Sequence, residues 1–190
     1  MKLFKRKEKN KNMQKKYIDF KWVITITTLA FLISLVFSLI TETTMPNANV
    51  IIASLIILLF IFLGMIFDMI GVAVAVADIN TFNSMSAKKV KGSKLAVVII
   101  KNASKAATFC NDVIGDICGV VSGGAGIALA TIIADTLNIN VFIPTLLITA
   151  LIAALTIGSK ALGKSTAMNK STEIVFRFSK ILSVFYRKYN

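Results

Sequence analysis

Four long apolar tracts, separated by clusters of basic residues, set the strongest limit on what this chain can fold into. The tracts cover about 23–40, 50–77, 106–134 and 141–159. Each is long enough to cross a hydrocarbon core of about 30 Å as a helix, which takes about 20 residues. The sequence therefore predicts an all-α membrane protein with four transmembrane helices.

The basic residues lie between and beside the apolar tracts. Of the 22 Lys and Arg residues, nine lie within 2–21, six within 88–105 and seven within 160–188. The positive-inside rule places such clusters on the cytoplasmic side of a membrane. We therefore attribute the formal net charge of +13 to membrane topology and expect no nucleic-acid partner. A soluble protein of this length would rarely contain 56% hydrophobic residues.

Placing every basic cluster in the cytoplasm requires an even number of crossings. Four crossings meet this requirement, with both termini cytoplasmic and with short outer turns at 41–49 and 135–140. We expect a multi-pass protein of the cell (inner or plasma) membrane. A cleaved signal peptide is the alternative for the first tract. Its 18 uncharged residues exceed a typical signal core, and 41–49 offers no good small-x-small cleavage site, so we interpret it as an uncleaved helix.

The chain divides into a basic cytoplasmic tail at 1–22, a transmembrane domain at 23–165 and a basic amphipathic juxtamembrane helix at 166–190. In the last part, apolar and basic side chains fall mostly on opposite sides of a helix. The apolar ones are Ile174, Val175, Phe178, Ile181, Leu182 and Phe185, and the basic ones are Arg177, Lys180, Arg187 and Lys188. We expect this helix and the tail to contact the lipid bilayer through anionic headgroups. Packing of the helix against the protein's own cytoplasmic loop is the alternative.

The loop at 80–105 allows two interpretations. It contains a short basic helical turn that a glycine would stop, followed by an apolar stretch. A helical hairpin at the membrane interface and a plain juxtamembrane loop fit this pattern equally well.

Acidic residues within the apolar tracts indicate a function. Asp112 and Asp116 lie four residues apart and so share one face of a helix, and Asp68 lies deep in the second tract. A charge at bilayer depth costs roughly 2.5–3.5 kcal/mol even on the mildest insertion scale, and such residues usually pair, bind an ion or pass a proton. No basic residue lies within the spans before Lys160. This acidic excess favours a cation.

Oxygen ligands such as carboxylate, amide carbonyl and hydroxyl suit Mg²⁺, Ca²⁺ or Na⁺. The candidate cation-facing residues are Asp68 of the second tract and Asn111, Asp112, Asp116 and Ser122 of the third. Structural roles are the alternative. Asp112 could complement a helix N-terminus and pair with Lys105, and Asp116 could be protonated and hydrogen-bond a neighbouring helix.

Gly115, Gly119 and Gly123 recur every four residues and predict a close helix-packing surface, within the bundle or between two copies of the chain. Cys110 and Cys118 lie about 12 Å apart along one helix, too far for a disulfide, and we interpret them as packing residues. The chain has no His, which excludes imidazole metal sites and His-based triads. No nucleophile paired with a base and no phosphate-binding loop is present, so we do not expect an enzyme.

Three stretches of this sequence resemble the transmembrane domain of the CNNM/CorC family of magnesium and cobalt transport proteins, in particular its small CorB-like bacterial members. They are 67–78 with 82–86 and 91–92, then 101–105 with 109–116, and finally 158–182. The resemblance covers about 50–190. Its most specific parts are Asn-Asp-x-x-Gly-Asp at 111–116 and the spacing of the juxtamembrane segments.

The resemblance implies a core of three transmembrane helices with cytoplasmic juxtamembrane amphipathic helices, to which the first helix is an addition. It also implies a homodimer that holds a dehydrated cation among polar side chains near mid-membrane, and a role in Mg²⁺ or Co²⁺ transport. Asn111 matches the family's Asn at the start of the middle core helix, and Lys164 matches the Lys of its Glu-x-x-Pro-Lys motif.

The chain departs from that motif at its acidic position. Lys160 and Gly163 stand where the family has Glu and Pro, and we find no nucleotide-binding CBS pair in this sequence. Lys160 is thus a candidate internal counter-ion for Asp68, Asp112 or Asp116. It favours the alternative function, a non-transporting membrane scaffold or regulator in which Lys160 neutralises the carboxylates. A small holin-like or membrane-stress protein is a third, weaker interpretation.

Overall fold

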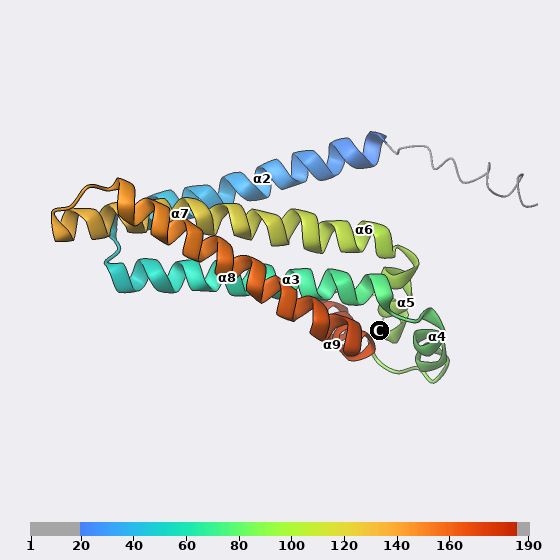
Figure 1. The fold of residues 1–190 in the computed structure, drawn as a ribbon. Helices are drawn as coiled ribbons and strands as arrows, with labels where there is room; N and C mark the ends of the chain where they lie inside the picture. The colour runs from blue at the N-terminus through green and yellow to red at the C-terminus, as the bar shows by residue number, and fades with distance from the viewer. Residues whose placement is uncertain (1–19, 186–190) are drawn as a thin grey trace, which may run out of the picture.

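Helices make up nearly all of the described part of the chain, residues 20–185 of the computed structural model (Figure 1). In chain order they are α2 (Phe20–Thr44), the 3₁₀ turn η1 (Met45–Asn47), α3 (Val50–Val76), α4 (Ile79–Ala87), α5 (Ser93–Lys101), α6 (Ala103–Thr108), the π-helical segment η2 (Phe109–Gly115), α7 (Asp116–Leu137), α8 (Phe142–Asn169) and α9 (Ser171–Phe185). No strand is present between residues 20 and 185. The predicted tail at 1–22 lies almost wholly outside the described residues, as do the last five residues of the segment at 166–190.

Four of the described helical stretches are long and apolar enough to cross a membrane. They are Phe20–Asn47, Val50–Val76, Ala103–Leu137 and Phe142–Asn169. These correspond to the four predicted tracts, so the expectation of an all-α, multi-pass membrane protein is confirmed.

Short polar side chains fix the helix ends at the turns before α3 and α8. Asn49 caps α3, because its side chain accepts a hydrogen bond from the N–H of Ile52 at 2.9 Å. Asn140 accepts one from the N–H of Phe142 at 2.9 Å, at the start of α8. Asn138 ends α7 with a φ of 52°, a left-handed conformation that Asn adopts more readily than most residues. These contacts satisfy backbone groups that a helix end leaves without partners.

α3 is the central helix and packs against α7, η2 and α8. Figure 1 shows these helices running along the length of the molecule, with α2 against α7. The rings of Phe37 on α2 and Phe60 on α3 meet edge to face, with their centroids 5.6 Å apart. Most of the apolar surface of α2 faces outward. The core therefore consists of α3, α7 and α8, with α2 added on one side.

α4, α5 and α9 gather at one end of the bundle, which we call the basic end because the Lys residues at 88–105 lie there. With the ends of α3 and α8 they enclose a hydrophobic cluster in which Phe82, Ala96 and Val175 are fully buried. Of the two interpretations of the loop at 80–105, the structure contains the helical hairpin. Its turn includes Gly92 at a φ of 86°, a conformation that favours glycine.

The three core helices carry uncharged stretches of equal length. Counted from the end opposite the basic end, each has 18 residues without a charged side chain, at 50–67, 117–134 and 142–159. At 1.5 Å per residue these stretches are about 27 Å long, close to the thickness of a hydrocarbon core. The charged residues at their basic-end limits are Asp68, Asp116 and Lys160. These side chains therefore lie at a similar level of the bundle, about 27 Å along the core helices from the opposite end.

α8 extends beyond the expected end of the transmembrane domain at 165. It continues to Asn169, and α9 begins at Ser171. Gly163 lets α8 approach α3 closely, since a Cβ at this glycine would lie 3.2 Å from Cγ of Met65. Ala167 is fully buried in the hydrophobic cluster of the basic end. This packing continues α8 for one further turn.

Candidate functional site

Polar side chains from four elements lie near the level where the uncharged stretches of the core helices end. They are Asp68 of α3, Asn111 of η2, Asp116 of α7, and Lys160 and Lys164 of α8, and we call this set the polar seam. Close helix packing brings them together, because the glycines of α3 and η2 allow the backbones to approach.

Lys160 contacts Asp116, one of the three carboxylates that it could neutralise. Its Nζ lies 2.9 Å from Oδ1 of Asp116 and donates a hydrogen bond to it, so the pair joins α8 to α7. The side chain of Lys160 is 18% exposed and that of Asp116 is 66% exposed. The stem of Lys160 is therefore packed between helices, while the carboxylate remains accessible.

Asp68 is the buried acid of the polar seam. The residue is only 4% exposed, and Nζ of Lys164 lies 3.9 Å from its Oδ2. No hydrogen bond reaches Oδ2 from the described part of the chain. Nζ of Lys164 is thus close enough to interact with the carboxylate, but Oδ2 lacks the hydrogen-bond donors that a buried carboxylate oxygen normally has.

Asn111 carries a second buried oxygen of this kind. Its Oδ1 has no hydrogen-bond partner among residues 20–185. The amide rests against Gly71, one turn beyond Asp68 on α3, where a Cβ would lie only 1.9 Å from Oδ1. Asp68 and Asn111 therefore place two buried acceptor oxygens along about one turn of α3. Buried acceptors without donors are exceptional in folded proteins.

The backbone around Asn111 is π-helical. This segment, η2, ends at Gly115, and the N–H of Asp116 donates to the carbonyl oxygens of Asn111 and Val113. A π-helical turn contains more residues than an α-helical one, so it changes the rotation between the helices on its two sides, and such turns occur frequently at functional sites. Here Asn111 faces α3, while Asp116 faces α8.

Two other predicted cation ligands make no ion pair or hydrogen bond with the polar seam in the described part of the chain. Asp112 is exposed. Lys105, its alternative partner, has its Nζ over the ring of Trp22, 4.7 Å from the centroid. Ser122 is fully buried, and its hydroxyl donates to the carbonyl oxygen of Gly119 at 2.9 Å, so it is engaged within α7.

The three predicted packing glycines have different surroundings. A Cβ at Gly115 would lie 3.6 Å from the carbonyl oxygen of Gly64, so this glycine packs on α3. A Cβ at Gly119 would lie 3.9 Å from Cγ2 of Thr156 on α8, whereas one at Gly123 would meet nothing within 4 Å. Within this chain the close-packing surface is therefore confined to the basic-end half of the glycine series.

Gly64 and Gly71 also shape this region of α3, although the sequence analysis assigned them no role. Their signal is spacing, since residues three or four positions from Asp68 lie on its helix face. Sequence reasoning also missed Thr156, whose Oγ1 is buried and has no partner in the described chain. Thr156 lies one turn before Lys160 on α8. The apolar tract at 141–159 contains other threonines, and nothing in the sequence around Thr156 distinguishes it from them.

The polar seam offers carboxylate, amide and hydroxyl oxygens, the ligands of hard cations. Between residues 20 and 185, no group of three or more His, Cys, Asp or Glu side chains is placed to hold a metal ion. The two ammonium groups of Lys160 and Lys164 instead supply the charge that a divalent ion would supply.

Comparisons of the chain with models of known protein families, with curated proteins and with solved structures found no match. The CNNM/CorC resemblance thus rests on the sequence patterns alone and stays a prediction.

Proposed function

We propose that the polar seam binds a cation, and that the chain is a cation-handling membrane protein of the kind that the CNNM/CorC resemblance implies. The observation that carries this proposal is the pair of buried acceptor oxygens, Oδ2 of Asp68 and Oδ1 of Asn111, neither of which receives a hydrogen bond in the described chain. A cation between α3 and η2 supplies what both oxygens lack.

The charges of the polar seam favour a monovalent cation such as Na⁺ over Mg²⁺ or Co²⁺. Lys164 is 53% exposed and 3.9 Å from Asp68, so it can swing away from the carboxylate. Replacing its ammonium group with one Na⁺ leaves the charge of the seam unchanged. A divalent ion also needs Asp116, which Lys160 holds at 2.9 Å. Lys164 is therefore the displaceable counter-ion, and Lys160 is the fixed one.

The basic end faces the cytoplasm in this proposal, as the positive-inside rule requires of its Lys-rich segments. The polar seam, at the boundary of the hydrocarbon core, then takes its cation from the cytoplasmic side of the cell membrane. A homodimer belongs to the same proposal, because the resemblance implies one and the open position at Gly123 leaves room on α7 for a second copy.

A scaffold or regulator without transport is the second candidate function. The observation that favours it is the ion pair between Lys160 and Asp116, which occupies a carboxylate and ties α7 to α8. In that case the polar seam only holds the helices together.

The melting temperature of the purified protein in detergent separates these two functions. A ligand that binds only the folded state stabilises it, so we expect NaCl to raise the melting temperature above that in choline chloride at equal ionic strength. Asp68→Asn removes the charge without changing the shape and should abolish the increase. Lys164→Gln should lower the Na⁺ concentration needed for half of the effect, because it removes the ammonium group that competes with Na⁺ for Asp68.

Asp135→Asn is the matched control, because it removes the same charge at an exposed position at the opposite end of the bundle and should respond to Na⁺ like the wild type. Flux of Na⁺ and Mg²⁺ into proteoliposomes is measured on the same preparations. An unchanged melting temperature across millimolar Na⁺ and Mg²⁺, together with no flux, would contradict cation binding and support the scaffold.

A further inference from the structure

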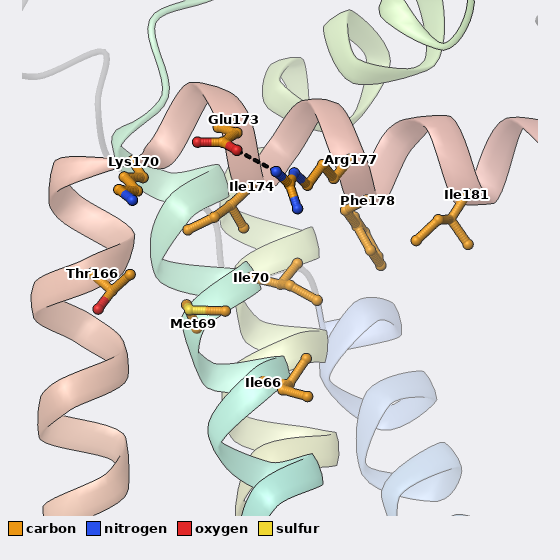
Figure 2. Close-up of a pocket in the computed structure, with 10 residues that line it drawn as sticks. All are labelled: Ile66, Met69, Ile70, Thr166, Lys170, Glu173, Ile174, Arg177, Phe178 and Ile181. Carbon is orange, nitrogen blue, oxygen red and sulfur yellow. Dashed lines mark hydrogen bonds and ion pairs between the residues drawn. The ribbon is translucent and has the colours of Figure 1, made fainter.

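A second feature lies on the other side of α3, where a pocket of about 390 Å³ opens beneath α9 (Figure 2). This volume is within the range of small-molecule binding sites. Ile66, Met69 and Ile70 line it from α3. At 100° per residue, Ile66 and Ile70 lie about 160° from Asp68 around α3, and Met69 lies about 100° from it. The pocket is therefore separate from the polar seam.

α9 lines the side of this pocket that faces α3. Figure 2 shows Ile174, Phe178 and Ile181 pointing from α9 toward α3. The other side of α9 is anchored, since Val175 and Ser179 are fully buried. α9 therefore packs on the protein, as the alternative interpretation expected, and still presents an apolar face, while its contact with the bilayer stays a prediction.

The rim of the pocket is charged. Lys170 lies at the junction of α8 and α9, and Arg177 forms an ion pair with Glu173 one turn earlier on α9 (Figure 2). Two basic groups and one acidic group leave the rim with a net positive charge. The side chain of Arg177 is 75% exposed, so it can reach a ligand as well as Glu173.

The level of the pocket matches a membrane interface. Ile66 and Ile70 flank Asp68 in sequence and so lie at the level where the uncharged stretches of the core helices end, which we take as the boundary of the hydrocarbon core. The apolar floor extends toward the core, and the charged rim lies on the aqueous side. Ile181, at the open side, is 62% exposed and needs an apolar cover.

We propose that this pocket binds one anionic phospholipid, with an acyl chain against the floor on α3 and the phosphate between Lys170 and Arg177. Basic side chains at an interface attract anionic headgroups, and Arg pairs with phosphate in a bidentate manner. Free phosphate would leave the apolar walls uncovered, and a zwitterionic lipid would not neutralise the rim. Charge and apolar surface together therefore select an anionic lipid.

Native mass spectrometry of the purified full chain with added phosphatidylglycerol or phosphatidylcholine tests this proposal. We expect one retained phosphatidylglycerol and weaker retention of phosphatidylcholine. Lys170→Gln combined with Arg177→Gln should weaken phosphatidylglycerol binding about thirtyfold, since each basic group near an anionic headgroup contributes roughly fivefold. Glu173→Gln should strengthen it, because the variant raises the rim charge and frees Arg177. A gain of binding cannot result from damaged folding.

Lys180→Gln and Val184→Gln are the matched controls, since both residues lie on α9 outside the pocket and are exposed. Lys180→Gln is the control for the two basic residues and should leave phosphatidylglycerol binding unchanged. Val184→Gln is the control for Ile181→Gln: we expect Ile181→Gln to weaken binding and Val184→Gln to leave it unchanged. Equal retention of the two lipids, equal loss in Lys180→Gln, no gain in Glu173→Gln, or displacement of the lipid by millimolar inorganic phosphate would each overturn the proposal. The Na⁺ response of the polar seam plays no part in these readouts.

Discussion

At the scale of single residues, Gly71 is needed because the side chain of Asn111 packs directly against its Cα. It sits in the regular part of α3, with no unusual backbone angle, yet the amide of Asn111 occupies the place of its Cβ. The residue that shapes the candidate site thus carries no functional group itself. Its contribution is the space that lets Asn111 lie one turn from Asp68.

Gly71→Ala should therefore remove the cation response without removing the fold. The new Cβ would meet Oδ1 and Cγ of Asn111, the end of a flexible side chain that can rotate away at a cost of about 1–3 kcal/mol. We expect unchanged helical circular dichroism and a melting temperature that no longer rises with Na⁺. Gly158→Ala, at an open position on α8, is the control. If Gly71→Ala kept the full Na⁺ response, Asn111 would not be a ligand.

Two residues of this site, Asp68 and Asn111, could be predicted from the sequence. Asp68 stands out because an acid in an apolar tract is costly, and Asn111 stands out by its amide oxygen and its match to the family's Asn. Asp112 and Ser122 could not be separated from them, because regular helical spacing does not foresee the π-helical turn of η2 or a hydroxyl engaged with its own helix. The partner of Lys160 also depends on how α8 rotates against α7, which spacing along one helix does not determine.

At the scale of helices and turns, the spanning helices follow from apolar length, while the elements at the basic end depend on contacts between distant segments. The sequence did not distinguish the hairpin of α4 and α5 from a plain loop, because Phe82 and Ala96 are buried by residues of α3 and α9, which are distant in sequence. α8 likewise passes the expected boundary because Ala167 is buried. Only the start of α4 has a strong local signal, the cap formed by Asp78.

That cap makes α4 sensitive to acid. The carboxylate of Asp78 accepts hydrogen bonds from the N–H of Asn80 at 3.0 Å and the hydroxyl of Thr81 at 3.1 Å, and these hold its pKa below the usual value of 3.8. A lowered pKa means that the capping contribution is complete above the usual value and is lost as the pH falls through the lowered one.

We expect amide exchange in the segment Ile79–Ala87, corrected for intrinsic rates, to be constant from pH 8 to about 5 and to accelerate below about pH 4. Asp78→Asn keeps an acceptor oxygen but does not titrate, so its exchange should show no such acceleration. Acceleration of equal size in Asp78→Asn would assign the effect to another group.

At the scale of the whole molecule, the two ends of the bundle differ in charge. The basic end carries the Lys residues at 88–105 and those of α9, whereas the opposite end carries Glu42 and Asp135. This asymmetry, together with four spans, is what the sequence predicts from charge and apolar length alone. The angle of α2 against the core could not be predicted, since most of its surface is apolar all round.

Thiol labelling tests the orientation of the bundle. Cys110 and Cys118 are buried and can be replaced by Ala to give a background without cysteine. On this background, Asn47→Cys lies at the end opposite the basic end, and Ala87→Cys lies at the basic end; both positions are exposed. In intact cells we expect an impermeant maleimide to label Asn47→Cys, and to label Ala87→Cys only after permeabilisation. The reverse pattern would place the basic end outside.

The equal uncharged stretches of α3, α7 and α8 have an electrical consequence. Nearly the whole transmembrane voltage falls across the hydrocarbon core, at about 2.3 kcal/mol per elementary charge per 100 mV. In the proposed function, an ion that reaches Asp68 from the basic end would have crossed almost none of that field, because about 27 Å of uncharged helix would lie beyond it. Occupancy of the polar seam would then be insensitive to membrane potential, and any step that carried the ion onward would carry nearly all of the voltage dependence.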